Sequence, residues 1–246
     1  LSQGDIQLLV GTHAILQPDV HFEDLGLVII DEQHRFGVQQ RQQLRKKGNS
    51  PDTLVMTATP IPRTLSLTLY GDLAMSVIDE LPPGRTPITT RIARASQRQQ
   101  LLGFVCRELD KGYQVYFVYP LVEESERSEL KAATEAFEAL QAELGEKYRG
   151  GLLHGRLHSR DKEAVMDQFK RGEVDYLVST TVIEVGIDVP NASVMVIEHA
   201  ERFGLAQLHQ LRGRVGRGAA KSYCILVQSD QCSNDGRQRL QIMQQS

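Results

Sequence analysis

Short apolar stretches recur along the chain and are separated by longer segments with helical periodicity. Continuous apolar runs of this kind are typical of parallel strands that are buried on both faces. The runs are IQLLV (6–10), LVII (27–30), LVMT (54–57), VYFVY (115–119), YLVS (176–179), VMVI (194–197) and YCILV (223–227). Their alternation with helical segments predicts an α/β fold built on open parallel sheets.

The chain length favours two domains. Its 246 residues, 41% of them hydrophobic, are more than one ordinary core requires. The segment LPPGRTP (81–87) holds three prolines and a glycine, which exclude a helix or a central strand. We therefore predict a first domain over 1–80, a linker over 81–90, a second domain over 91–230 and a C-terminal helical extension over 231–246.

Charge is balanced overall but uneven locally. The net charge is −3, yet Arg202–Lys221 contains five basic residues and no acidic one. Such a run is able to face phosphate, or it is a solvated helix face. Residues 123–147 carry eight acidic and three basic residues, which predicts a solvent-facing helical insertion.

Several features bear on where the protein works. The aliphatic stretch Leu25–Ile30 is far shorter than the roughly 20 residues that span a bilayer, so no membrane helix is expected. Cys106, Cys224 and Cys232 are odd in number and lack C-x-x-C spacing, which favours a reducing cytoplasm. The start, LSQGDIQLLVG, has no initiator Met and no signal peptide, which predicts a cut inside a longer protein.

Two carboxylates follow the second apolar run. LVII leads directly into Asp31 and Glu32, at the strand end where open α/β sheets hold their ligands. In phosphoryl transfer one carboxylate holds Mg²⁺ through its water shell, and a second orients or deprotonates the attacking water. Asp31 suits the first role and Glu32 the second. The other interpretation of this dipeptide is a turn or a helix cap.

Three further segments place polar groups after apolar runs or group arginines together. TATPIPRT (57–64) places hydroxyls at a strand end before a proline-stiffened helix start, and alone it is an ordinary loop. STT (179–181) also follows a strand run, and its hydroxyls and backbone amides suit a sugar-phosphate backbone. In QLRGRVGR (210–217), Arg214 and Arg217 share one side if the segment is helical. Guanidinium groups suit a γ-phosphate because each offers permanent charge and a rigid fork of donors.

Taken together, these motifs resemble superfamily 2 DExH-type helicases and translocases. DEQH looks like their Walker B motif, TAT like motif III, STTVIEVGIDVP like motif V and QLRGRVGR like motif VI. Within the superfamily, DEQHRFGVQQR, IDELPPGRTPI and AQLHQLRGRVGRG are most similar to the RecG family of branch-migrating DNA helicases. The resemblance implies two RecA-like parallel-sheet lobes of the P-loop NTPase type, the first incomplete, with ATP and Mg²⁺ between them.

The resemblance also implies a role for each matching residue. Asp31 and Glu32 would serve Mg²⁺ and water, with the metal held by Asp31 through water. The residues expected around the nucleotide are Gln33, His34, Gly186, Asp188, Gln210, Arg214 and Arg217. Those expected to touch DNA are Gly11, Thr12, His13, Thr180 and Thr181, and those expected to couple the two sites are Thr57, Ala58 and Thr59. The expected partner is branched or duplex DNA, contacted through its backbone.

The chain also departs from the family pattern. No G-x-x-x-x-G-K-[ST] loop occurs, and GGLLHGRL (150–157) has the glycine spacing without the Lys. The Walker A segment and the N-terminal wedge domain of the family are therefore expected to lie outside this chain. The expected function is the motor of a DNA helicase that reverses forks and migrates Holliday junctions. A transcription-repair coupling translocase, an RNA-directed helicase and a non-catalytic nucleic-acid-binding module are the alternatives.

Overall fold

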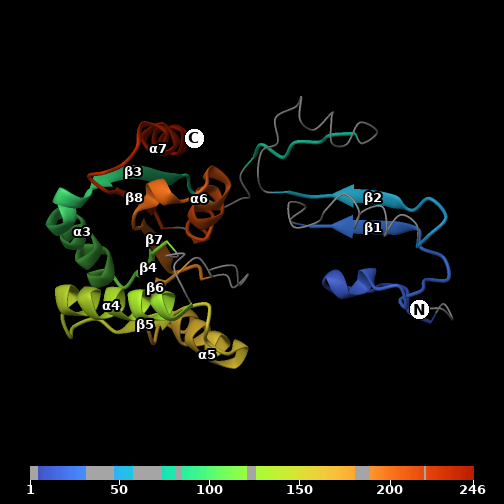
Figure 1. The fold of residues 1–246 in the computed structure, drawn as a ribbon, viewed down its shortest axis with the longest axis horizontal. Helices are drawn as coiled ribbons and strands as arrows, with labels where there is room; N and C mark the ends of the chain where they lie inside the picture. Colours follow the sequence, from blue (N-terminus) through green and yellow to red (C-terminus); the bar gives the residue numbers. More distant parts are fainter. Residues whose placement is uncertain are drawn as a thin grey trace. The chain divides into compact units, whose positions relative to one another are not determined.

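A computed structural model of the chain gives two compact units, Leu1–Met75 and Ser76–Ser246 (Figure 1). The boundary falls a few residues before the predicted linker. Each unit is described by itself. The structure describes residues 5–31, 47–57, 74–80, 85–120, 126–180, 189–218 and 220–246.

The first unit contains a small parallel sheet. Strand β1 (Leu27–Ile30) pairs with β2 (Asp52–Val55), with Ile30 opposite Val55. Val28 and Ile30 are buried against Leu16 and Leu25, whereas Ile29 is 56% exposed. Successive side chains of a strand point to opposite faces, and the described residues cover only one face of this sheet. The expected burial on both faces is therefore not met for β1.

The first apolar run is not a strand. IQLLV (6–10) has no regular structure, and Leu8 and Val10 are 80% and 85% exposed. An apolar run becomes a strand only where a neighbouring strand pairs with its backbone groups. None of the described strands pairs with this segment, so the strand prediction is wrong here.

The second unit is built on a six-stranded parallel sheet in the order β3-β8-β7-β4-β6-β5, which Figure 1 shows from top to bottom. The predicted α/β fold with parallel sheets is thus confirmed. The strands are β3 (Ile88–Arg94), β4 (Gln114–Val118), β5 (Gly150–Leu153), β6 (Tyr176–Ser179), β7 (Ala192–Ile197) and β8 (Ser222–Gln228). Strands β4, β6 and β7 are buried along their whole length, as their continuous apolar runs predict.

Helices cover both faces of this sheet. One face packs Phe117 and Val196 against α3 (Arg98–Asp110) and α4 (Glu126–Leu144). The opposite face packs Met195 and Leu226 against three other α-helices of the described residues. These are α5 (Ser159–Lys170), α6 (Leu205–Arg212) and α7 (Asn234–Gln245). The described part of the chain also contains three short 3-10 helices: η1 (His13–Leu16), η3 (Ala95–Gln97) and η4 (Ala200–Arg202).

Helix α4 corrects the interpretation of 123–147 as a solvent-facing insertion. Its Ala133 is 2% exposed, and Leu140 and Leu144 belong to the buried core on the α3 side of the sheet. The segment is mostly acidic in composition, but its apolar residues lie along one side of the helix. The helix is therefore a structural layer of the second unit.

Two strands lacked the expected apolar run. Strand β3 reads ITTRIAR, and its polar residues suit an edge strand that pairs only with β8. Strand β5 reads GGLL, and its glycines make room for neighbours. A Cβ on Gly150 would come within 2.5 Å of the Tyr176 hydroxyl oxygen and 2.8 Å of the Phe137 ring.

The segments predicted as linker and extension contribute to the second unit. Strand β3 begins at Ile88, inside the predicted linker 81–90 and ahead of the predicted domain start at 91. Before it, Thr86 Oγ1 donates to the Ala220 carbonyl oxygen at 3.1 Å. Helix α7 lies within 231–246, and its Leu240 and Met243 are part of the main core.

Three further findings concern the described residues alone. Cys106, Cys224 and Cys232 are free thiols, and burial raises the pKa of Cys224 to about 12. Within the described ranges, no group of three or more His, Cys, Asp or Glu side chains is placed to hold a metal ion. No helix in the described part of the chain is both long and apolar enough to cross a bilayer.

Candidate functional site

The sheet of the second unit has two chemically different edges. All six strands are parallel, so their carboxyl ends meet along one edge and their amino ends along the other. We call these the carboxyl edge and the amino edge. The predicted site residues of this unit divide between them.

Asp31 and Thr57 follow adjacent strands in the first unit. Asp31 comes directly after β1, and Thr57 follows β2 by two residues. The Met56 amide donates to the Ile30 carbonyl at 2.8 Å, which continues the strand pairing up to these residues. Both are exposed. Carboxylate and hydroxyl oxygens are hard donors of the kind that Mg²⁺ and its water shell accept.

Gly11 and Thr12 precede the 3-10 helix η1. The Thr12 carbonyl accepts a hydrogen bond from the Ile15 amide at 3.1 Å, and both Gly11 and Thr12 are exposed. The apolar run 6–10 predicts a strand directly before these residues, but that segment is irregular. The prediction that Gly11 and Thr12 follow a strand is therefore wrong. A Cβ on Gly11 would approach the Ile15 side chain to 2.9 Å.

Arg214 and Arg217 lie at the amino edge, between α6 and β8. Helix α6 ends at Arg212, so the helical spacing that would align the two arginines is not present. A turn replaces it: Gly216 adopts φ +77°, and Arg217 Nε donates to the Gly213 carbonyl at 3.2 Å. Both arginines are half-buried, so they sit in the loop and not on a helix face.

Two contacts hold this arginine loop against neighbouring strands. Arg85 Nε donates to the Gly216 carbonyl oxygen at 3.2 Å, just ahead of β3. Gly218 packs so closely on Pro190 that a Cβ would overlap the Pro190 carbonyl oxygen. Pro190 lies two residues before the start of β7. The loop is therefore tied to the starts of two strands, which fixes its backbone at the amino edge.

The basic run Arg202–Lys221 is not one surface. Arg202 lies at the carboxyl edge after β7, whereas Arg214, Arg217 and Lys221 lie at the amino edge. Arg212 turns towards the end of α7 and donates to the Met243 carbonyl at 3.3 Å and to Ser246 Oγ at 3.2 Å. The run is therefore neither a single phosphate-facing strip nor a single solvated helix face.

Gln210 lies on α6 one turn before the arginine loop and is half-buried. Beside it, burial and the positive charge of Arg212 lower the pKa of His209. The lowered pKa favours the neutral form of His209, so the positive charge that suits an anionic ligand in this region comes from arginine side chains.

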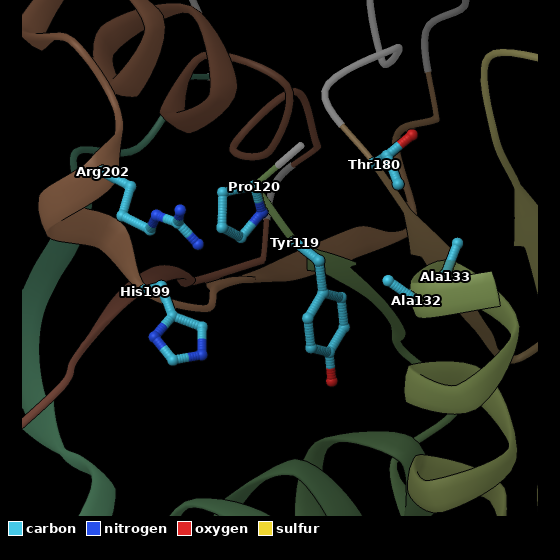
Figure 2. A pocket seen from close by; sticks show the side chains of 7 residues that line it. All are labelled: Tyr119, Pro120, Ala132, Ala133, Thr180, His199 and Arg202. Atoms are coloured by element: carbon cyan, nitrogen blue, oxygen red, sulfur yellow. The ribbon is translucent and has the colours of Figure 1, made fainter. Parts of the chain in front are cut away.

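A pocket of about 160 Å³ opens at the carboxyl edge (Figure 2). It is lined by Tyr119, Pro120, Ala132, Ala133, Thr180, His199 and Arg202. Figure 2 shows His199 and Arg202 on one side of the pocket and Thr180 with the two alanines on the other. Thr180 is 3% exposed, so it forms a buried part of the pocket wall. No motif in the sequence marked Tyr119, His199 or Arg202 as site residues.

The remaining expected site residues lie outside the described part of the chain. These are Glu32, Gln33, His34, Ala58, Thr59, Thr181, Gly186 and Asp188, together with the side chain of His13. Of the loop that links β6 to β7, the structure describes the ends at Thr180 and Val189.

Two family models match the chain, one on each unit. "DEAD/DEAH box helicase" matches residues 1–68, and "Helicase conserved C-terminal domain" matches residues 96–219, just over half of the chain. The chain belongs to the helicase C-terminal domain family. Its parallel sheets are thus RecA-like helicase domains, as the motifs predicted.

Relatives named ATP-dependent DNA helicase RecG match nearly the whole chain. The protein from Synechocystis sp. is 59% identical over 246 residues, and that from Thermotoga maritima is 56% identical over 230 residues. They cover 100% and 94% of this chain, and each alignment spans 30% of the relative. The predicted resemblance to RecG is confirmed. The chain spans about a third of the length of these relatives.

Solved structures agree. "Structure of RecG bound to three-way DNA junction" matches 96% of this chain with a TM-score of 0.72 and 51% identity, over 30% of that chain. "S. cerevisiae Dbp5 bound to RNA and ADP BeF3" matches 94% of this chain and 61% of that chain, with a TM-score of 0.63 and 17% identity. At that identity the second match supports the fold alone.

Proposed function

We propose that this chain provides the two RecA-like motor segments of an ATP-dependent DNA helicase that remodels branched DNA by fork reversal and Holliday junction migration. The observation that carries the proposal is identity of 51–59% with proteins named ATP-dependent DNA helicase RecG, over nearly the whole chain. A relative of this identity bound to a three-way DNA junction supports the choice of substrate.

In this proposal the first unit serves the metal and the attacking water. Asp31 holds Mg²⁺ through water and Glu32 orients the nucleophile, while bound ATP and Mg²⁺ supply the transferable phosphoryl group and neutralise its charge. The exposed position of Asp31 at a strand end fits this donor role. Gln33 and His34 connect the nucleotide to DNA, and Thr57, Ala58 and Thr59 transmit between the two sites.

The amino edge of the second unit serves the phosphates. Arg214 and Arg217 stabilise the charge that develops on the γ-phosphate in the transition state. Gln210, Gly186 and Asp188 complete the nucleotide pocket. Support comes from the half-buried arginines and from their loop, whose backbone is fixed to the starts of β3 and β7.

The DNA backbone would be contacted by the carboxyl edge of the second unit and by Gly11, Thr12 and His13 of the first. Thr180 and Thr181 donate to phosphate from the end of β6. Arg202 adds positive charge on the other side of the pocket, next to the His199 ring. Because phosphate contacts dominate such binding, affinity is expected to fall steeply with salt and to depend weakly on sequence.

Substrate preference tests the proposal. At the full length of the RecG relatives, ATP hydrolysis is expected to be stimulated more by a three-way or four-way DNA junction than by linear duplex, and least by RNA. The measurement is steady-state phosphate release at saturating nucleic acid. Preference for RNA would point to an RNA-directed helicase, and equal stimulation by linear duplex would favour a transcription-repair translocase.

The 246-residue chain alone is expected to turn over no ATP. It contains no G-x-x-x-x-G-K-[ST] loop, and the Lys and hydroxyl of that loop bind the β- and γ-phosphates and Mg²⁺. The measurement is phosphate release from the purified chain with and without DNA. DNA-stimulated turnover by a homogeneous sample would contradict this expectation, and DNA binding without turnover would agree with it.

A further inference from the structure

One guanidinium joins three elements at the carboxyl edge. Arg98, the first residue of α3, donates from Nη2 to Glu143 Oε2 of α4 at 2.7 Å and from Nε to the same oxygen at 3.2 Å. Its Nη1 donates to Glu198, which directly follows β7. The Glu198 side chain is 9% exposed, so this carboxylate is nearly removed from water.

This cluster lies beside Tyr119, a wall of the pocket. Burial lowers the pKa of Arg98, but the hydrogen bonds with Glu143 and the negative charge of Glu198 outweigh burial and raise it. Burial and the charge of Glu198 raise the pKa of Tyr119 to about 12, and Arg98 opposes that rise. Arg98 therefore stays charged and Tyr119 stays neutral at any physiological pH.

Glu198 is also the first residue of the turn that carries His199 and Arg202, two residues that line the pocket. Its amide donates to the Val118 carbonyl at 2.8 Å. The next residue, His199, adopts the left-handed conformation with φ 48° and ψ 46°, which disfavours a residue with a side chain. A strained conformation persists where neighbouring contacts fix it. The Arg98–Glu198 pair supplies such a contact directly before the strained residue.

The far end of the same turn is fixed as well. Arg239 on α7 donates to the Glu201 carbonyl at 3.1 Å and to the Phe203 carbonyl at 2.9 Å. Arg202 lies between these two carbonyls and lines the pocket. Arg239 holds one end of the turn and Arg98 holds the other through Glu198. Loss of the Glu198 contact would therefore release one end of the turn and change the direction of the Arg202 side chain.

We propose that Arg98 is a positioning residue for DNA contact: by anchoring Glu198, it holds the His199 turn that aims Arg202 into the carboxyl-edge pocket, where Arg202 meets a DNA phosphate. This rests on the proposed DNA contact of that edge. Arg98 touches no DNA itself. Arginine suits the role because its planar fork engages two carboxylates at once, which the single ammonium of lysine does not reproduce.

The test is a double-mutant cycle on this chain. Binding to a fluorescent three-way DNA junction is measured by anisotropy for the wild type, Arg98→Lys, Arg202→Gln and the double variant. Arg98→Lys keeps the charge and is expected to weaken binding about fivefold, and Arg202→Gln about tenfold. The double variant is expected to bind within about twofold of Arg202→Gln alone, because residues that act through one another are not additive.

Arg149→Lys is the matched control. Arg149 makes the same kind of forked contact with Asp175, at 2.9 Å from Nη2 and 3.1 Å from Nε, but at the amino edge. It is expected to leave junction affinity unchanged. Should Arg98→Lys fail to keep its near-ultraviolet circular dichroism signal, Glu198→Gln takes its place, because it weakens the same anchor from the other partner.

The outcomes separate the two proposals. If the wild type binds and Arg202→Gln weakens binding, the DNA contact stands, and additive effects of the Arg98 and Arg202 changes would then overturn the positioning role alone. Unchanged junction affinity of Arg98→Lys would also overturn the positioning role and leave the DNA contact standing. If the wild type binds and Arg202→Gln binds equally tightly, the DNA contact of Arg202 is wrong, and the role of Arg98 falls with it.

Discussion

Replacing Arg217 by alanine is expected to lower DNA-stimulated ATP hydrolysis by about 10³-fold or more at the full length of the RecG relatives. Junction affinity should stay within about twofold of the wild type. The reason is that Arg217 sits in the amino-edge loop, away from the carboxyl-edge pocket, and its charge is needed when negative charge develops in the transition state. The measurements are phosphate release at saturating junction and fluorescence anisotropy.

Arg149→Ala is the control for Arg217→Ala. It removes an arginine from the same edge, one that is 59% exposed and paired with Asp175, and it is expected to leave hydrolysis unchanged. Wild-type turnover by Arg217→Ala would remove that residue from the nucleotide site. A loss of DNA affinity in step with the loss of turnover would place it on the DNA side instead.

Replacing Gly218 by alanine is expected to destabilise the second unit by about 1–3 kcal/mol, the usual range when a packed site receives an extra carbon. The new Cβ would overlap the Pro190 carbonyl oxygen, and a backbone atom cannot rotate out of the way. The arginine loop must then move off the start of β7, so hydrolysis is expected to fall as well. Chemical denaturation of the 246-residue chain measures the free energy of unfolding.

Gly213→Ala is the matched change in the same loop. Gly213 adopts φ −66°, and its Cβ would meet the His209 carbonyl oxygen at an ordinary 3.4 Å. Its effect on the free energy of unfolding is expected to stay within about 0.5 kcal/mol. Equal destabilisation by the two alanines would mean that the Pro190 contact does not decide the position of the loop.

Continuous apolar runs predicted the central strands of the second unit well. YLVS (176–179) coincides with β6, and VMVI (194–197) forms most of β7, because strands covered on both faces have no polar side. IQLLV (6–10) has the same composition but no described pairing partner. Composition records that a segment is apolar, and it does not record whether a neighbouring strand is there to pair with it.

Edges and glycines limited the prediction elsewhere. Strand β3 carries arginine and threonine because it is an edge strand, and β5 begins with two glycines because Tyr176 fills the space beside Gly150. Neither sequence looks like a buried strand. In α4 the many acidic residues predicted a solvent-facing helix, although an apolar stripe packs that helix against the sheet.

The candidate site was predictable only where function is concentrated in a motif. The arginine loop was found from QLRGRVGR, but its turn geometry depends on contacts with Pro190 and Arg85, which are distant in sequence. Thr180 was predicted from STT, but the pocket around it was missed because Tyr119 and Arg202 follow two other strands. Only the strand order brings such scattered residues together.

The placement of Arg217 and Arg202 at opposite edges of one sheet has a consequence for mixed populations of molecules. Under the proposed function, a copy that loses Arg217 would still occupy a junction but would not move along it, and it would keep unaltered copies away. A copy that loses Arg202 would dissociate and leave the junction to others. Lesions in the two arginines are therefore expected to differ in dominance when both forms are present in one cell.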